Sequence, residues 1–226
     1  MAKDIYFVGG SKGGVGKSMV AVALLDYLID RYEDVILIES DTSNPDVWKT
    51  YHSCTKSELI NLDEADGWIA LVNICEMNPN CPVVVNSASR NNVGVTTYGA
   101  TLNSSIHELE RKLITLWVIN RQRDSLELLK EYMETMTETV PHAVRNAHWG
   151  EERKFELYQN SRLKAEIESR GGKSLTFPDL ADRVADELNR TRMTIAVGLR
   201  ELPLGNRAEL SRWRSEAAKV FAQVHS

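Results

Sequence analysis

Residues 9–18 read Gly9-Gly10-Ser11-Lys12-Gly13-Gly14-Val15-Gly16-Lys17-Ser18, a glycine-rich decapeptide that carries two lysines. It lies between a short apolar run at 4–8 and a segment with helical apolar spacing at 17–31. The glycines let backbone N–H groups approach one anion without a Cβ clash. The start of a helix adds further free N–H groups and the positive end of its dipole. A loop of this kind between a strand and a helix predicts a phosphate-binding site.

Two side chains of the loop carry the chemistry that such a site needs. Lys17 can reach the β- and γ-phosphates of a nucleotide, and the Ser18 hydroxyl can ligate Mg²⁺. The strict spacing Gly-x-x-x-x-Gly-Lys-Ser requires a glycine at position 11, where this chain has Ser11. The alternative interpretation is a glycine-rich turn whose lysines, Lys12 and Lys17, are simply solvated.

Outward from the loop, short apolar runs alternate with longer segments of helical spacing. The strand candidates are residues 4–8, 35–38, 82–85, 113–119 and 140–144. The helix candidates are residues 17–31, 63–77, 104–112, 125–136, 151–169, 178–190 and 206–224. This alternation predicts an α/β fold, a mostly parallel twisted sheet with helices on both faces. We expect residues 1–226 to form one domain with a helical C-terminal extension from about 178 to 226; the alternative is that this part packs as an integral layer.

The composition is that of a soluble globular protein. The 226 residues include 27 Lys and Arg against 32 Asp and Glu, a formal net charge of −5, which excludes collagen-like, coiled-coil and wholly disordered classes. No apolar run approaches the roughly 18–20 residues that span a bilayer. The apolar part of the N-terminus is also too short for a secretory signal, so we expect a cytoplasmic protein. Cys54, Cys75 and Cys81 lack the spacing of a disulfide framework, a zinc site or an iron–sulfur site.

The heptapeptide at 12–18 resembles the deviant Walker A box of the MinD/ParA superfamily of P-loop ATPases. The resemblance implies ATP or ADP with Mg²⁺ as ligands. It also implies nucleotide contacts from Ser11, Lys12, Gly13, Gly14, Val15, Gly16, Lys17, Ser18 and Met19. In that family the lysine at the position of Lys12 reaches across a dimer interface to the partner's nucleotide, so the resemblance gives catalytic roles to Lys12 and Lys17.

A second stretch of the chain, Val35-Ile36-Leu37-Ile38-Glu39-Ser40-Asp41, resembles the family strand that ends in two acidic residues. The resemblance implies that Asp41 is catalytic, orienting the attacking water, or that it joins Ser18 in the Mg²⁺ shell. Glu39 stands where the family more often has Asp. A carboxylate at the C-terminal end of a parallel strand faces the crevice where ligands bind. The alternative is a polar turn at 41–45 that satisfies only the backbone.

The family's third signature is a hydrophobic strand that ends in the Walker B carboxylate. Residues 82–89 lie in the corresponding place, but they contain no acid, and Val85 or Asn86 occupies the position. An amide can hydrogen-bond a metal-bound water but supplies no charge. The resemblance therefore implies nucleotide binding, with hydrolysis that is slow, partner-stimulated or absent.

Asn120 follows the apolar run at 113–119 and resembles the adenine-reading Asn of the superfamily. Its amide can donate to and accept from the edge of a base. The alternative is that Asn120 caps the loop before Asp124.

Residues 144–156 and 174–180 resemble ParA-like proteins of plasmid transfer and stabilisation operons, of the TraL, MobD and StbB type. This implies an ATP-dependent dimer switch in plasmid partition, stability or conjugative transfer. The implied partners are a second copy of the chain and a plasmid-encoded DNA-binding or transfer protein. The alternatives are a nucleotide-sensing adaptor that does not hydrolyse ATP, and a metabolic ATP-dependent ligase of the dethiobiotin or cobyrinate type.

The helix expected at 206–224 carries Arg207, Arg212, Arg214 and Lys219. These side chains could make salt-dependent, non-specific contacts with DNA phosphates. They could equally form local ion pairs on a solvated helix face. The apolar face of this helix has few large residues, which disfavours membrane binding.

Overall fold

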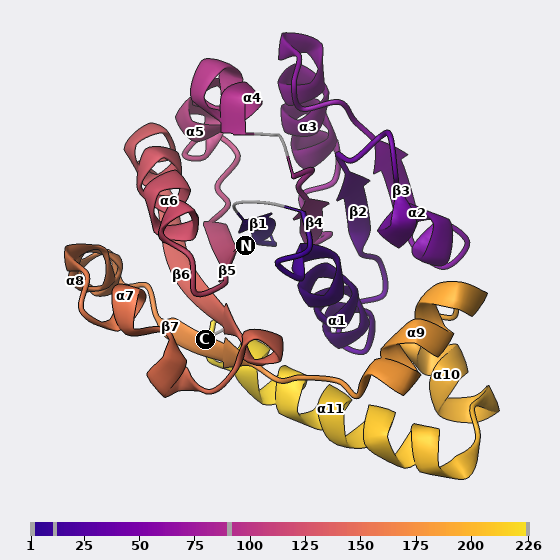
Figure 1. The fold of residues 1–226 in the computed structure, drawn as a ribbon. Helices are drawn as coiled ribbons and strands as arrows, with labels where there is room; N and C mark the ends of the chain where they lie inside the picture. The colour runs from indigo at the N-terminus through magenta and orange to yellow at the C-terminus, as the bar shows by residue number, and fades with distance from the viewer. Residues whose placement is uncertain (1–2, 11–12, 90–91, 225–226) are drawn as a thin grey trace.

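The computed structural model describes residues 3–10, 13–89 and 92–224, and a seven-stranded sheet forms its centre (Figure 1). The strands lie in the order β3-β2-β4-β1-β5-β6-β7, and neighbouring strands are parallel. Their bounds are β1 Ile5–Gly10, β2 Ile36–Glu39, β3 Lys56–Leu59, β4 Val83–Asn86, β5 Leu113–Ile119, β6 Thr139–Asn146 and β7 Ser174–Phe177. The predicted α/β fold with a parallel sheet is confirmed.

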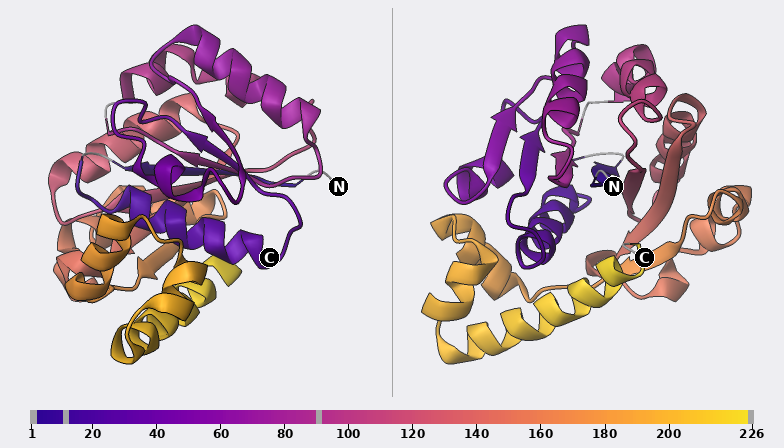
Figure 2. Two further views of the ribbon diagram at one scale, coloured as in Figure 1. Left: turned by 90° about the vertical axis from the view of Figure 1, so that its right-hand side faces the viewer. Right: turned by 180° about the vertical axis from the view of Figure 1, so that it is seen from behind.

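Helices cover both faces of this sheet, as the edge-on view in Figure 2 shows. They are α1 Lys17–Ile29, α2 Asp46–Tyr51, α3 Ala65–Met77, α4 Asn92–Tyr98, α5 Ala100–Ser105, α6 Arg123–Thr135, α7 Glu156–Gln159, α8 Arg162–Ser169, α9 Asp182–Thr191, α10 Ile195–Glu201 and α11 Leu204–Ala222. Short 3-10 turns follow β6, namely η1 Ala147–Trp149 and η2 Glu152–Lys154.

The side chains of each strand alternate between two cores. In β1, Tyr6 and Val8 face the core that α1, α2 and α9–α11 complete, whereas Ile5 and Phe7 face the core that α3–α8 complete. A strand with helices on both faces is buried throughout, and all six residues of β1 are buried. This explains why the central strands are continuous apolar runs in the sequence.

The predicted strands occur within two residues of their expected ends, and β5 matches its expected bounds. The sequence patterns did not indicate β3 and β7. Both are outer strands of the sheet, and three of the four β3 residues are exposed, so neither strand needs a long apolar run.

Two helix predictions need correction. The helix expected at 104–112 is wrong in its position, because α5 ends at Ser105. The continuous helix expected at 151–169 is divided into η2, α7 and α8, and Ser161 caps α8 by accepting from the Lys164 N–H. Three short helices, α2, α4 and α10, were not predicted, since helices of six and seven residues show little periodicity.

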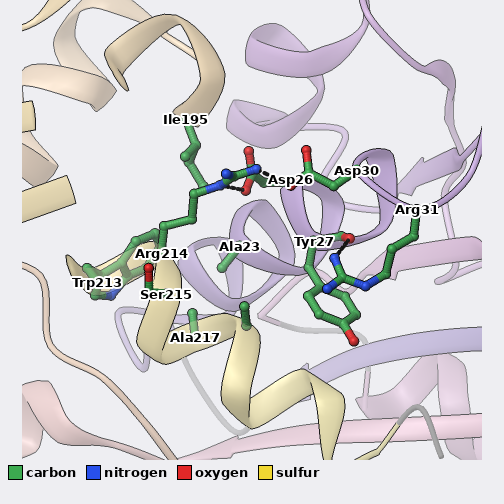
Figure 3. Close-up of a pocket in the computed structure, with 11 residues that line it drawn as sticks. Ala23, Asp26, Tyr27, Asp30, Arg31, Ile195, Trp213, Arg214, Ser215 and Ala217 are labelled. Atoms are coloured by element: carbon green, nitrogen blue, oxygen red, sulfur yellow. Dashed lines mark hydrogen bonds and ion pairs between the residues drawn. The ribbon is translucent and has the colours of Figure 1, made fainter. Parts of the chain in front are cut away.

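The C-terminal helices share a core with α1. Arg214 of α11 donates to Asp26 of α1 at 2.5 Å and also binds Asp30 (Figure 3). Burial raises the pKa of Asp26, and Arg214 opposes that rise. A cavity of about 130 Å³ lies beside this ion pair, and Arg31 stacks over the Tyr27 ring on its wall at 3.6 Å. Of the two arrangements left open by the sequence, the structure has the integral layer.

Among the described residues, no helix is both long enough and apolar enough to cross a membrane.

Candidate functional site

The glycine-rich loop connects β1 to α1 at the C-terminal edge of the sheet. Gly14 and Gly16 adopt left-handed backbone conformations, with φ of 79° and 103°, which favour glycine. Among the described residues, no atom lies within 4 Å of a Cβ built on Gly14, so they leave open space there. Gly16 is the N-cap of α1, so the free N–H groups of the first helical turn face the loop. The predicted contacts of Ser11 and Lys12 lie outside the described residues.

Lys17 is the first residue of α1, and only 6% of its surface is exposed. Desolvation lowers its pKa to about 8, and the nearby charge of Asp41 opposes that shift. Ser18 is exposed on the same helical turn, and Met19 is half-buried beside it. Lys17 therefore lies near the charge of Asp41, and Ser18 follows Lys17 in the first turn of α1, whereas their roles toward a nucleotide remain predictions.

The turn after β2 orients Asp41. Its Oδ1 accepts from the Ser43 hydroxyl at 2.7 Å and from the Asn44 N–H at 3.0 Å. The predicted polar turn is thus present and holds the carboxylate in place. The turn interpretation and the functional interpretation of Asp41 are therefore compatible, because a metal or water site requires a carboxylate that is held in position.

Glu39 and Asn86 form a buried pair at the ends of β2 and β4. They are register partners across the two strands, and Asn86 Nδ2 donates to both Glu39 carboxylate oxygens, at 3.0 and 3.1 Å. Burial raises the pKa of Glu39 to about 7, against the hydrogen bonds from Asn86 and the Asp41 N–H. Asn86 Oδ1 is also buried and accepts no hydrogen bond from the described residues.

The structure also shows the contacts of Asn120. Its Oδ1 accepts from the Gln122 N–H at 2.9 Å and from the Ser125 hydroxyl at 2.8 Å. These contacts match the predicted capping of the loop before α6. The base-reading role remains a prediction.

A second asparagine, Asn146 at the end of β6, contacts the phosphate loop directly. Its Nδ2 donates to the Val15 carbonyl at 2.9 Å, and its Oδ1 accepts from the His148 N–H at 3.1 Å. A Cβ on Gly16 would lie 2.2 Å from Asn146 Nδ2, so the Asn146 side chain occupies space that a glycine at position 16 leaves free. The sequence patterns did not indicate a role for Asn146, although it lies in the segment 144–156 that resembles ParA-like proteins.

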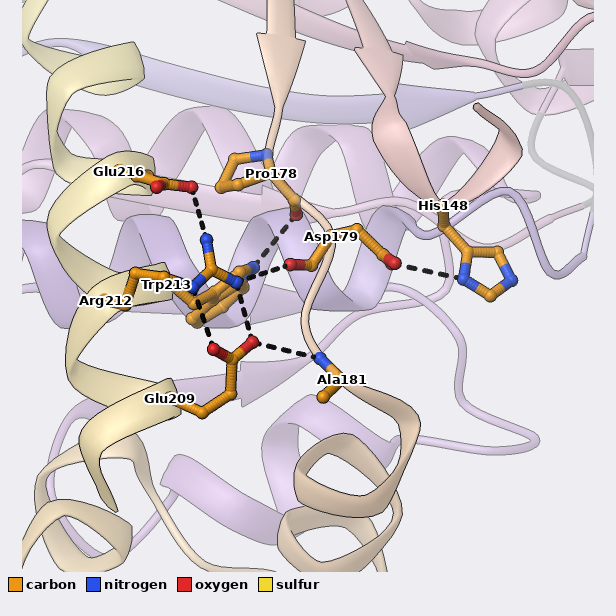
Figure 4. Close-up of polar contacts among 8 residues, drawn as sticks. All are labelled: His148, Pro178, Asp179, Ala181, Glu209, Arg212, Trp213 and Glu216. Carbon is orange, nitrogen blue, oxygen red and sulfur yellow. Dashed lines mark hydrogen bonds and ion pairs between the residues drawn. The ribbon is translucent and has the colours of Figure 1, made fainter. Parts of the chain in front are cut away.

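A cavity of about 200 Å³ opens beside the loop on the Asn146 side. Its walls include Gly14, Gly16, Met19, Asn146, His148 and Pro178. His148 Nδ1 lies 3.3 Å from Asp179 Oδ1, so the segment after β6 approaches the segment after β7 here (Figure 4). Trp213 of α11 anchors the β7 segment by donating to the Pro178 carbonyl at 2.9 Å. The cavity is thus a partly apolar recess that is continuous with the phosphate loop.

The donor set fits a nucleotide phosphate with Mg²⁺. Mg²⁺ prefers oxygen ligands and keeps several of its waters. The Ser18 hydroxyl and the Asp41 carboxylate are oxygens of that kind, and the buried Asn86 Oδ1, which has no donor among the described residues, can accept from such a water. The open space at Gly14 and the N–H groups at the start of α1 suit a phosphate. Within the described residues, no cluster of three or more His, Cys, Asp or Glu forms a separate metal site.

Two of the three arginines of α11 are engaged in ion pairs. Arg212 binds Glu209 at 2.6 Å and Glu216 at 2.7 Å (Figure 4), and Arg214 binds Asp26 and Asp30. Arg207 donates to the Arg200 carbonyl. The contacts of Arg212 agree with the local ion-pair interpretation of the helix, whereas Arg214 pairs with residues 26 and 30, far away in the sequence.

Comparison with known proteins gives four similarities. The sequence pattern of the family described as "CobQ/CobB/MinD/ParA nucleotide binding domain" matches residues 6–148. The protein MobD of Acidithiobacillus ferrooxidans is 65% identical over 224 residues, 99% of each chain. The MinD cell division protein of Aquifex aeolicus shares the fold with a TM-score of 0.57 at 12% identity, over 97% of each chain. The septum site-determining protein MinD of Pyrococcus horikoshii, complexed with Mg-ADP, gives 0.57 at 10% identity over 99% of each chain.

Proposed function

The chain belongs to the CobQ/CobB/MinD/ParA nucleotide-binding family, and we propose that it is an ATP-dependent dimer switch. The observation that carries this proposal is the phosphate loop. It has two left-handed glycines, a buried Lys17 and the Asp41 carboxylate at the end of the neighbouring β2. The ligands are ATP or ADP with Mg²⁺, held by residues 11–19 and by Asp41.

Each described residue of the site has a defined task. The N–H groups of the loop and of the first turn of α1 bind phosphate oxygens, and Lys17 neutralises their charge. When bound, Mg²⁺ supplies charge neutralisation at the phosphates, with Ser18 and Asp41 as its protein ligands. Asp41, fixed by Ser43 and Asn44, is also placed to orient an attacking water.

The base of the nucleotide is proposed to enter the recess beside Asn146. This recess is continuous with Gly14 and Gly16, and its apolar walls suit one face of a purine. The Asn120 amide is the second candidate for base recognition, although its oxygen already serves the turn before α6. Asn146→Ala and Asn120→Ala distinguish them, since only loss of the base contact weakens ATP binding relative to inorganic triphosphate.

The dimer is proposed to form face to face on ATP binding, with each Lys12 contacting the other subunit's nucleotide. Lys12→Ala is then expected to bind ATP as a monomer but to lose ATP-dependent dimerisation, measured by light scattering. Intact ATP-dependent dimers of this variant would contradict the role of Lys12.

The biological role is inferred from the relative named MobD, together with the ParA-like segments of the sequence. We place the protein in the cytoplasm of a bacterium that carries a plasmid or similar mobile element. There the ATP-bound dimer would engage a plasmid-encoded partition or transfer protein. Direct contact with DNA would need basic side chains other than the paired arginines of α11.

A nucleotide-sensing adaptor without turnover is the second candidate. The observation that favours it is Asn86, an amide at the end of β4 where hydrolysis would benefit from a carboxylate. Both candidates predict ATP binding that Lys17→Ala abolishes, because Lys17 faces the phosphates in either case.

Equilibrium ATP binding, followed by phosphate release in the same sample, separates the candidates. Mg²⁺-dependent release that Lys17→Ala abolishes would support the ATPase. Tight binding without release would support the adaptor. Absence of binding to the full chain would contradict both.

A further inference from the structure

In a metal site, one carboxylate can supply both the negative charge and the acceptor for a metal-bound water. Here Glu39 on β2 offers the first of these features, and Asn86 on β4 offers the second. We propose that Glu39 supplies the negative charge for the nucleotide's Mg²⁺, while Asn86 Oδ1 accepts a hydrogen bond from a metal-bound water. This inference rests on the proposed nucleotide binding, and it assigns Glu39 and Asn86 as positioning residues for the metal.

Glu39 supplies the carboxyl group of the pair, and a cation beside it would favour the charged form. The side chain is fully buried, and none of the described lysines or arginines forms an ion pair with it. A buried carboxylate without a cation is costly. A divalent cation at the phosphate loop would compensate this charge, because β1 and β2 both flank β4 and end at the same edge of the sheet.

The acceptor is available at Asn86. Because both of its Nδ2 hydrogen bonds go to Glu39, the planar amide turns Oδ1 away from that carboxylate. A buried acceptor that has no donor among the described residues is unfavourable, and a bound water would satisfy it. The two observations point to one ligand, a hydrated cation that approaches the ends of β2 and β4.

The pairing also explains why an amide suits position 86. An aspartate there would bring two carboxylates to about 3 Å of each other, and like charges at that distance resist ionisation together. An amide instead binds the Glu39 carboxylate when the metal is absent. The present pair therefore keeps the metal-free site hydrogen-bonded.

The test compares ATP affinity in Mg²⁺ with ATP affinity in EDTA, using a fluorescent ATP analogue. Wild type is expected to gain affinity from Mg²⁺, and Glu39→Gln is expected to reduce that gain at least tenfold, because one close charge is lost. The double variant Glu39→Gln with Asn86→Asp moves the charge to β4 and is expected to restore the gain. Glu58→Gln, on the exposed edge strand β3, is the matched control and should behave as wild type.

Binding of Mn²⁺ to the protein–ADP complex, measured by electron paramagnetic resonance, gives a readout independent of turnover. Asn86→Asp alone is expected to bind Mn²⁺ more tightly than wild type and to show a larger rise in melting temperature with Mg²⁺. This variant keeps the test decisive even if Glu39→Gln does not fold.

The outcomes separate the two levels of the proposal. Absence of ATP binding to wild type, in EDTA and in Mg²⁺, would contradict the proposed function itself. ATP binding with a Mg²⁺ gain that Glu39→Gln retains would overturn only the role of Glu39. A folded double variant that does not recover the gain, or an Asn86→Asp variant with unchanged Mn²⁺ affinity, would overturn the division of roles.

Discussion

Substitution of Gly16 by alanine tests how the phosphate loop is held. Gly16 has φ of 103°, and an added Cβ would lie 2.2 Å from Asn146 Nδ2. A side chain in the left-handed region costs about 1–2 kcal/mol. Displacing Asn146 from the Val15 carbonyl, a bond of 2.9 Å, adds about 1–2 kcal/mol for a buried group left unsatisfied.

The expected loss for Gly16→Ala is therefore about 2–4 kcal/mol in the free energy of unfolding. For a chain of this size, that loss corresponds to a fall of roughly 5–15 °C in melting temperature. Urea unfolding and thermal melts of the nucleotide-free protein measure both quantities.

Gly14→Ala is the matched control for this experiment. Its φ of 79° imposes the same kind of backbone strain, but its Cβ would lie more than 4 Å from every atom of the described residues. We expect it to cost about 1–2 kcal/mol. In the double variant Gly16→Ala with Asn146→Ala, the two losses should be less than additive, because one substitution relieves the clash of the other. Equal losses for the two glycine variants, or strict additivity with Asn146→Ala, would refute the reasoning.

Three further predictions concern parts of the chain outside the loop. Arg214→Met leaves Asp26 buried without this partner and is expected to lower the free energy of unfolding by about 2–3 kcal/mol, measured in urea. This loss is smaller than for a fully buried ion pair, because a third of the Arg214 side chain is exposed. Adding Asp26→Leu should recover most of the loss. Burial lowers the pKa of His142 to about 4. As pH drops, the unfolded chain therefore protonates this histidine before the folded chain does, and the free energy of unfolding should fall by about 3 kcal/mol between pH 6.5 and 4. His142→Gln should flatten that part of the pH profile relative to wild type, and an unchanged slope would contradict the assignment. Arg207→Gln with Arg212→Gln should leave any DNA affinity and its salt dependence unchanged in anisotropy titrations, since ion pairs and a backbone carbonyl already occupy these arginines.

The central strands could be predicted because burial on both faces leaves a mark in the sequence. Residues 36–39, 83–86 and 113–119 are apolar almost throughout, since helices cover them above and below. β3 and β7 lack that requirement at the sheet edges. Their hydrogen bonds come from neighbouring strands, and a backbone partner far along the chain leaves no local pattern.

The helices show the same distinction between local and distant causes. The pattern at 63–77 predicts α3 because Trp68, Leu71 and Cys75 face one core. In the divided segment 151–169, η2 is instead bound to the preceding strand, where Arg145 of β6 binds Glu152 at 2.5 Å. No periodicity within the segment itself records that ion pair.

The same distinction between local and distant causes applies to the residues of the candidate site. The positions of Lys17, Ser18 and Asp41 could be predicted because they belong to a contiguous motif and to a strand end, and their roles remain predictions. Asn146 lies 131 residues from the Val15 carbonyl that it contacts, and a sequence does not say which strand end approaches a loop. Asn86 illustrates the point most clearly. Taken alone, it is an amide where the family has a carboxylate, whereas in the fold it is hydrogen-bonded to the Glu39 carboxyl group, 47 residues away. The consequence is that loss of an acid from one strand does not show loss of metal binding until the neighbouring strand end has been examined.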